Sequence, residues 1–145
     1  MSLVTTIAKS VASELNKHDF SLPFEAVFTV KPGFELSELE TLRVIVVPKT
    51  FEIETVSRSS SKYLVSVDVG IMQRIGKMTP EEAVETLGDL VDEIIEFLEQ
   101  KTLEELPAAQ CIGVANDPLY VPDHLTQSRT FTSVVNVKYA LTSDR

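Results

Sequence analysis

Cysteine is almost absent from this sequence, because Cys111 is the only one among 145 residues. A disulfide within the chain is therefore impossible, and packing alone must hold the fold together. No stretch approaches the ~20 consecutive apolar residues of a membrane span. Residues 1–16 lack the basic start and continuous apolar segment of a secretory signal. We expect a soluble intracellular product without a membrane partner.

Basic residues are also scarce, since 13 Lys and Arg face 22 Asp and Glu, for a formal net charge of −9. This charge opposes general affinity for nucleic acid, which depends on cations that displace phosphate counterions. Apolar residues make up 43% of the chain, an ordinary globular proportion. A length of 145 residues suits one domain, which we expect to span residues 1–145.

Two helices are predicted from apolar spacing. The first follows Leu3, Ile7, Val11 and Leu15 and ends near His18, before Pro23. The second begins at Thr79, Pro80 and Glu82, where the Thr hydroxyl caps the first turn and proline presets the backbone. Its core stripe comprises Val84, Leu87, Val91, Ile94 and Leu98.

Strands are predicted from alternating apolar residues over the ranges 25–30, 42–47, 51–56, 63–71, 112–115 and 130–142. Pro48 separates the second and third ranges and indicates a bulge or an edge. The polar residues 57–61 indicate a hairpin turn, and residues 116–129 a long loop. The predicted fold is α+β, a mostly antiparallel sheet packed against the N-terminal helix and the long capped second helix.

No catalytic, cofactor or metal site is recognisable. Zinc sites need three or four ligands at close spacing, whereas His18 and His124 lie far apart and Cys111 has no partner cysteine. We interpret Cys111 as a small buried core residue, because it leads into a strand rather than lying beside a base. Asp117, Asp123 and His124 remain the candidates for an enzymatic site built from scattered residues.

The second helix carries a run of acidic residues at spacings of four and three: Glu85, Asp89, Asp92, Glu96 and Glu99. Like charges at this spacing each cost about 0.2–0.5 kcal/mol, so helix stability does not explain them. They form a solvated face, or they face basic groups on a neighbour, or they line a channel through which an anionic polymer slides.

Basic residues cluster in the sequence before that helix: Arg43, Lys49, Arg58, Lys62, Arg74 and Lys77. A molecule that is basic on one side and acidic on another can associate head to tail, and such contacts close into rings when the rotation permits. The aromatic residues Phe131, Tyr139 and Tyr120 are interpreted as core rather than as a platform for bases, since no basic groove accompanies them.

The order of elements resembles that of tail terminator and tail-completion (head-tail joining) proteins of tailed bacteriophages. The segments that carry the resemblance are Leu42-Arg43-Val44-Ile45-Val46-Val47-Pro48, the Ser57-Arg58 turn, Val69-Gly70-Ile71, Asp117-Pro118-Leu119-Tyr120 and Phe131-Thr132-Ser133. The resemblance implies a structural virion protein and no catalytic residues. It also implies that copies of the protein form a ring, in this family a hexamer. The tail tube protein and the head-tail connector would be its other partners, and DNA would only pass through.

The contact residues that we expect on this basis lie on the hairpin, the acidic helix and the long loop: Lys49, Arg58, Lys62, Glu85, Asp89, Asp92, Glu96, Asp117, Tyr120 and Arg129. The resemblance places the protein in the virion, assembled in the cytoplasm of the bacterial host. The alternative hypothesis is a small binding module, outside any virion, that captures a basic peptide or protein through the acidic stripe.

Overall fold

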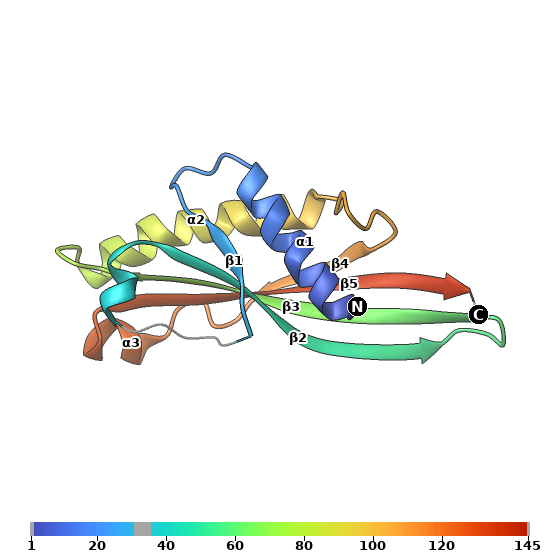
Figure 1. Ribbon diagram of the computed structural model, residues 1–145. Coiled ribbons are helices and arrows are strands. Elements are labelled where there is room, and N and C mark those ends of the chain that lie inside the picture. The colour runs from blue at the N-terminus through green and yellow to red at the C-terminus, as the bar shows by residue number, and fades with distance from the viewer. Residues whose placement is uncertain (1, 31–35, 145) are drawn as a thin grey trace.

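Two long helices lie on the same face of a twisted sheet (Figure 1). The computed structural model describes residues 2–30 and 36–144. Along the chain the elements are α1 (Leu3–Lys17), β1 (Ala26–Phe28), the 3-10 helix η1 (Leu36–Glu40), β2 (Arg43–Thr55), β3 (Ser60–Arg74), α2 (Pro80–Gln100), β4 (Gln110–Asn116), α3 (Pro122–Gln127) and β5 (Thr130–Asp144). Helices and strands thus combine as the sequence predicts, in an α+β fold.

The described strands form one five-stranded sheet in the order β1-β2-β3-β5-β4. Only β1 runs parallel to its neighbour, whereas the other three pairings are antiparallel. The predicted mostly antiparallel sheet is therefore confirmed. Strands β3 and β5 are paired along their full length, from Ser60 with Asp144 to Arg74 with Thr130. They are the two longest strands of the described sheet.

The two strands predicted around Pro48 are a single strand, so their separation was wrong. Strand β2 runs through Pro48, and its register against β3 shifts between Pro48 and Thr50. The shift leaves Lys49 without a partner in β3, and a proline is tolerated beside such a bulge because the ladder is already interrupted there. The bulge that Pro48 predicts is confirmed.

The core lies between the helices and the near face of the sheet. Helix α1 contacts β1, β2 and β3, whereas α2 contacts β4 and β5. The sheet contributes Val67 and Val137, each 0% exposed, and the helices contribute Val11 and Leu90, also 0% exposed. Thr79 caps α2 as predicted, because its Oγ1 accepts a hydrogen bond of 3.2 Å from the backbone N–H of Glu82.

The sequence analysis missed two short helices, the 3-10 helix η1 and the helix α3, which lies in the predicted loop of residues 116–129. Six residues are too few for an apolar period to be visible, and only Leu125 of this helix is buried. The hydrogen bond from the N–H of Leu125 to the carbonyl of Val121 starts the helix. Residues on either side of α3 thereby become fixed against β5.

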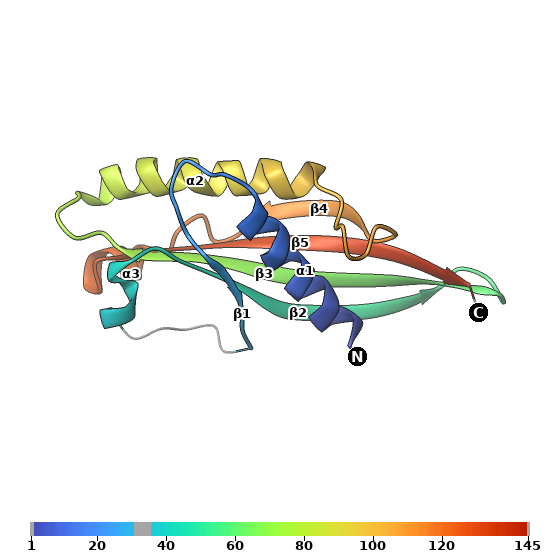
Figure 2. The ribbon, with the colours of Figure 1, turned by 45° about the horizontal axis from the view of Figure 1, so that its top comes forward.

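Part of the sheet projects beyond the helices. Strand β1 pairs only with Val44–Val46, and β4 pairs with β5 no further than Ala140. The three central strands continue past both, as Figure 2 shows, and end at the hairpin turn of residues 56–59. We call this projection, residues 51–63 and 141–144, the tongue. Within the described residues, no helix is long and apolar enough to cross a membrane.

Candidate interaction surfaces

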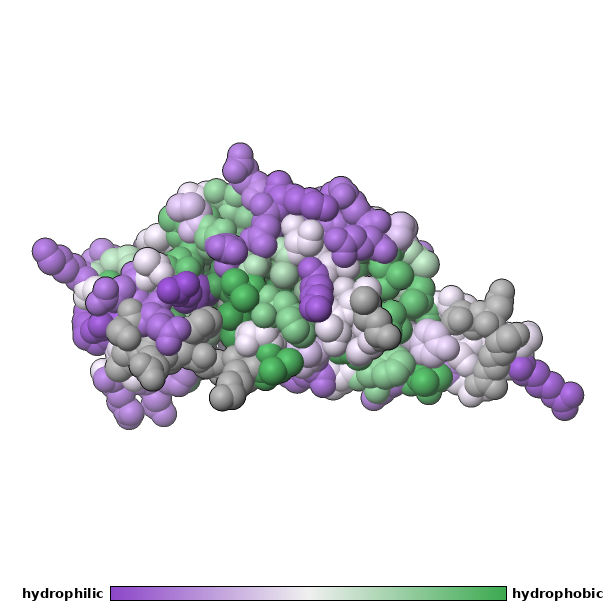
Figure 3. Space-filling view, viewed as in Figure 1, coloured by the Kyte–Doolittle hydropathy of each residue, from purple (hydrophilic) through white to green (hydrophobic). Residues whose placement is uncertain are grey.

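The acidic residues of α2 lie together on its outer side. Glu85, Asp89, Asp92, Glu96 and Glu99 are all exposed. In the space-filling view, hydrophilic side chains gather along the upper edge of the molecule, where α1 and α2 end (Figure 3). None of these five acidic residues takes part in the ion pairs formed within the described part of the chain. Because the opposite side of α2 packs into the core, this stripe of like charge faces outward without cationic partners.

The basic residues do not form the cluster that their sequence positions suggest. Arg43 lies at one end of β2 and Arg58 lies in the turn after its other end. Thirteen strand residues separate these two ends, which is about 40 Å at 3.3 Å per residue. These charges therefore lie along the length of the sheet rather than together at one place.

Two of the predicted contact residues on the hairpin have neighbours of opposite charge. Lys49 Nζ lies 3.3 Å from Asp68 Oδ2, on the face of the sheet away from the helices. They border a hollow of about 300 Å³ whose apolar lining includes Ile45 and Met72. Lys62 lies opposite Glu54 in the register of β3 with β2, within the tongue. Arg58, in contrast, is exposed at the turn and forms no ion pair with another described residue.

The predicted contact residues of the long loop have different environments. Arg129 has a φ of 46°, and its guanidinium donates hydrogen bonds of 2.8 and 3.1 Å to the carbonyls of Gly76 and Met78. It therefore fastens the turn before α2. Asp117 is exposed, and its backbone N–H donates to the carbonyl of Val134 at 3.0 Å.

Tyr120 was predicted to be a core residue, and this was wrong because 37% of it is exposed. Phe131 and Tyr139, which alternate along β5, are buried as predicted, each 1% exposed. Phe131 and Tyr139 are buried because they lie on the face of β5 that the helices cover. Tyr120 is more exposed because it lies outside the sheet, between β4 and α3.

Tyr120 and Glu85 meet in a groove between α2 and α3. It has a volume of about 470 Å³, and its lining consists of Pro80, Glu81, Val84, Glu85, Tyr120, Pro122, Leu125 and Thr126. We call it the α2–α3 groove. Sequence reasoning missed it because its two walls lie some forty residues apart and α3 was not predicted. The lining of the groove thus combines apolar side chains with the two carboxylates of Glu81 and Glu85.

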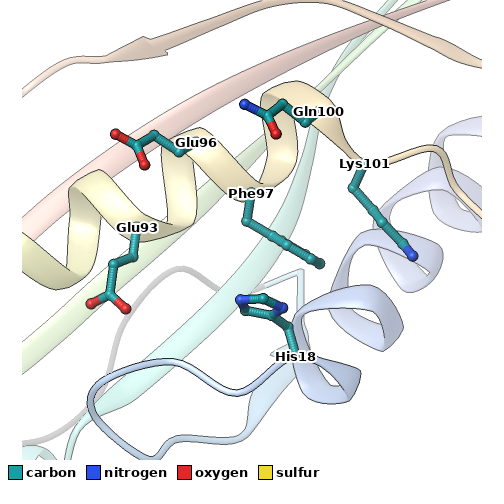
Figure 4. Close-up of a pocket in the computed structure, with 6 residues that line it drawn as sticks. All are labelled: His18, Glu93, Glu96, Phe97, Gln100 and Lys101. Carbon is teal, nitrogen blue, oxygen red and sulfur yellow. The ribbon is translucent and has the colours of Figure 1, made fainter.

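A second hollow, of about 400 Å³, lies where α1 ends beside α2 and includes the predicted contact residue Glu96 (Figure 4). The ring of His18 stacks on that of Phe97 with a centroid distance of 4.5 Å. Glu93, also in its lining, accepts hydrogen bonds from the backbone N–H and the hydroxyl of Ser21. These contacts join the end of α1 to α2.

The remaining candidates for chemistry lie apart. His124 is exposed on α3 and its Nδ1 lies 2.9 Å from Thr132 Oγ1. Among the described residues, no three His, Cys, Asp or Glu side chains are grouped to hold a metal ion.

Cys111, predicted to be a buried core residue, packs against the core but is only half-buried, because β4 is an edge strand. Burial raises the pKa of its thiol, which disfavours the nucleophilic thiolate.

The tongue exposes apolar side chains that the alternation pattern would place in a core. Phe51 and Ile53 point to the face that the helices cover elsewhere, yet they are 46% and 57% exposed. The Phe51 ring lies 5.9 Å from that of Tyr63, and Val56 at the turn is 61% exposed. Neighbouring exposed apolar residues of this kind mark contact surfaces.

Comparison with known proteins identifies the fold. No family model matches the sequence, and no curated protein matches it. A solved structure is similar over 97% of this chain and 95% of its own, with a TM-score of 0.51 and 17% sequence identity. The name of that protein states no function. The likeness therefore establishes an α+β architecture that another chain shares along nearly its whole length.

Proposed function

We propose that this chain is a structural subunit of a tailed bacteriophage, a tail terminator or another head-tail joining protein that assembles as a ring at the head-proximal end of the tail. It acts in the virion after assembly in the bacterial cytoplasm. Its partners are further copies of itself, the tail tube protein and the head-tail connector. In this role it ends tube growth and makes no covalent bond.

The tongue is the observation that supports this proposal most. It extends the sheet beyond the helices and presents Phe51, Ile53 and Val56 to solvent. An isolated subunit gains nothing from exposing these side chains, whereas a subunit in an assembly buries them against a neighbour. Because the tongue and the helix-covered body differ in shape and charge, a contact between them is heterologous, and heterologous contacts close into rings when the rotation permits.

The unpaired carboxylates of α2 are compatible with the same role. Five exposed acidic residues on one helix face repel DNA, so a ring that turned this face inward would let DNA pass without binding it. They also favour a second candidate function, a module that binds a basic peptide or protein. In that case the stripe is the binding site and no ring is needed.

Light scattering after size-exclusion chromatography distinguishes the two functions. We expect a ring-sized species, or a monomer that becomes ring-shaped only at the end of a tail tube, where electron microscopy would show it. Tail tube protein polymerised with this protein should yield tubes of restricted length. A chain that remains monomeric in low and moderate salt, and also beside growing tubes, would rule out the terminator function.

A further inference from the structure

The α2–α3 groove has the composition of a binding site for an apolar and basic segment. Val84, Tyr120 and Leu125 supply its apolar lining, whereas Glu81 and Glu85 supply charge. Both glutamates are exposed, and no ion pair within residues 2–30 and 36–144 includes either of them. No lysine or arginine lines the groove. An apolar side chain followed closely by a cation would complement both features.

The hairpin turn at the tip of the tongue offers such a segment. Val56 is 61% exposed and Arg58 is exposed two residues later. The turn is held by hydrogen bonds of 3.2 Å from the N–H groups of Val56 and Ser57 to the carbonyl of Ser60. The hydroxyls of Ser57 and Ser60 lie 3.0 Å apart. Because these contacts fix the turn in advance, docking it costs little conformational entropy.

We infer that the tip of the tongue, residues 56–59, docks in the α2–α3 groove of a second copy of this chain. This inference rests on the proposed function, in which copies join head to tail. Val56 enters the apolar part of the groove, and the Arg58 guanidinium meets the carboxylates of Glu81 and Glu85. Charge-assisted hydrogen bonds of this kind are among the stronger polar contacts in proteins.

The arrangement of the two surfaces in one molecule favours this pairing. The tip lies at one end of the elongated sheet, and α3 lies at the other (Figure 1). The tip of one copy therefore cannot fill its own groove, and each copy leaves one tip and one groove for its neighbours. Repetition of that contact produces a closed ring or a filament rather than a symmetric dimer.

Charge reversal on each side of the contact tests the inference. The variant Arg58→Glu and the double variant Glu81→Lys with Glu85→Lys should each associate about 10- to 100-fold more weakly than the wild type. A mixture of the two variants in equal amounts should associate again, because the reversed tip of the first meets the reversed groove of the second, and the unchanged Arg58 meets the unchanged glutamates. Matched controls are Lys138→Glu and Asp19→Lys, both at exposed positions, which should assemble like the wild type.

The outcomes separate this inference from the proposed function. If the wild type forms rings and both charge-reversal variants do so equally well, the tip does not dock in the groove, but the terminator function stands. If the wild type binds an unrelated basic peptide without self-association, and the variant Glu81→Lys with Glu85→Lys does not bind it, the groove belongs to another partner and the inference fails. If the wild type remains monomeric even with tail tubes, both proposals fail.

Cross-linking gives a second test that does not depend on loss of assembly. In a Cys111→Ser background, the pair Ser57→Cys and Thr126→Cys places one thiol at the tip and one at the groove. Oxidation should produce a ladder of disulfide-linked multimers. Each single cysteine should yield dimers at most, and the control pair Ser57→Cys with Glu99→Cys should give no ladder. Equal ladders from both pairs would overturn the inference.

Discussion

The backbone N–H of Glu104 donates a hydrogen bond of 2.7 Å to Oε2 of Glu14, a carboxylate that is only 1% exposed. The contact joins α1 to the segment after α2, some ninety residues later. The other oxygen, Oε1, has no hydrogen-bond partner among the described residues, although Lys101 Nζ lies 3.9 Å away. The buried Glu14 carboxylate is therefore stabilised by one backbone N–H and by the nearby Lys101 ammonium.

Replacing Glu14 should destabilise the fold. We expect Glu14→Ala to lower the free energy of unfolding by about 2 kcal/mol, because the hydrogen bond to a charged acceptor is lost. Glu14→Gln keeps an acceptor oxygen and should lose less. Urea unfolding measures both, with Glu85→Gln on the exposed stripe as the control. An unchanged midpoint for Glu14→Ala would contradict the structural role of this contact.

Tyr139 should make the protein sensitive to alkali. Burial, with smaller effects from Cys111 and Glu14, raises the pKa of its hydroxyl above the usual value of about 10. Above about pH 10 the unfolded chain loses a proton that the folded chain retains, so stability falls as pH rises. Between about pH 9 and pH 11, we expect the wild type to lose about 1.4 kcal/mol more than Tyr139→Phe.

The same substitution has a neutral-pH consequence. The Tyr139 hydroxyl has no hydrogen-bond partner within the described part of the chain, so its removal forfeits no such bond. Tyr139→Phe should therefore unfold at the same or slightly higher urea concentration than the wild type near pH 7. A marked loss of stability there would indicate a buried water bonded to the hydroxyl.

The cap of α2 should contribute measurably to stability. Thr79→Ala removes the acceptor for the N–H of Glu82 and should cost about 1 kcal/mol in thermal or urea unfolding. Thr86→Ala is the matched control, because Thr86 is an exposed residue within the same helix. It should gain a few tenths of a kcal/mol through helix propensity. Equal effects at the two positions would rule out a capping role.

The acidic stripe can be tested by reversing the charge at its middle. Asp89→Lys replaces repulsion by attraction toward Glu85 and Glu93, each four residues away, and should stabilise the monomer by up to about 1 kcal/mol. If the stripe contacts a basic neighbour, this more stable variant should bind its partner or tail tube less well. Unchanged assembly would show that the stripe is only a solvated face.

Much of the fold could be predicted because its local signals agree. The Thr79 cap, the apolar spacing of α2 and the alternation of β5 each indicate the element that forms. The bulge at Pro48 was predicted, but its neighbours were assigned to two strands because proline usually interrupts a ladder. Helix α3 was missed because it is shorter than two turns and buries only Leu125.

The candidate surfaces were harder to predict, since alternation reports which side chains share a face but not whether that face is covered. Phe51 and Ile53 continue the pattern of the core, yet they lie on the tongue. The stripe on α2 was predicted residue by residue because a helix fixes which positions lie together. The groove at Tyr120 joins distant segments, and no local pattern contains that information.

The unbroken pairing of β3 with β5 has a mechanical consequence. Residues from Ser60 to Arg74 are matched one by one with residues from Asp144 to Thr130, without a shift in register. A force along the strand axes is shared among many hydrogen bonds at once, as in shear, rather than breaking them in succession. A load applied at the tip of the tongue is thus transmitted through continuous strand pairing to the far end of the molecule.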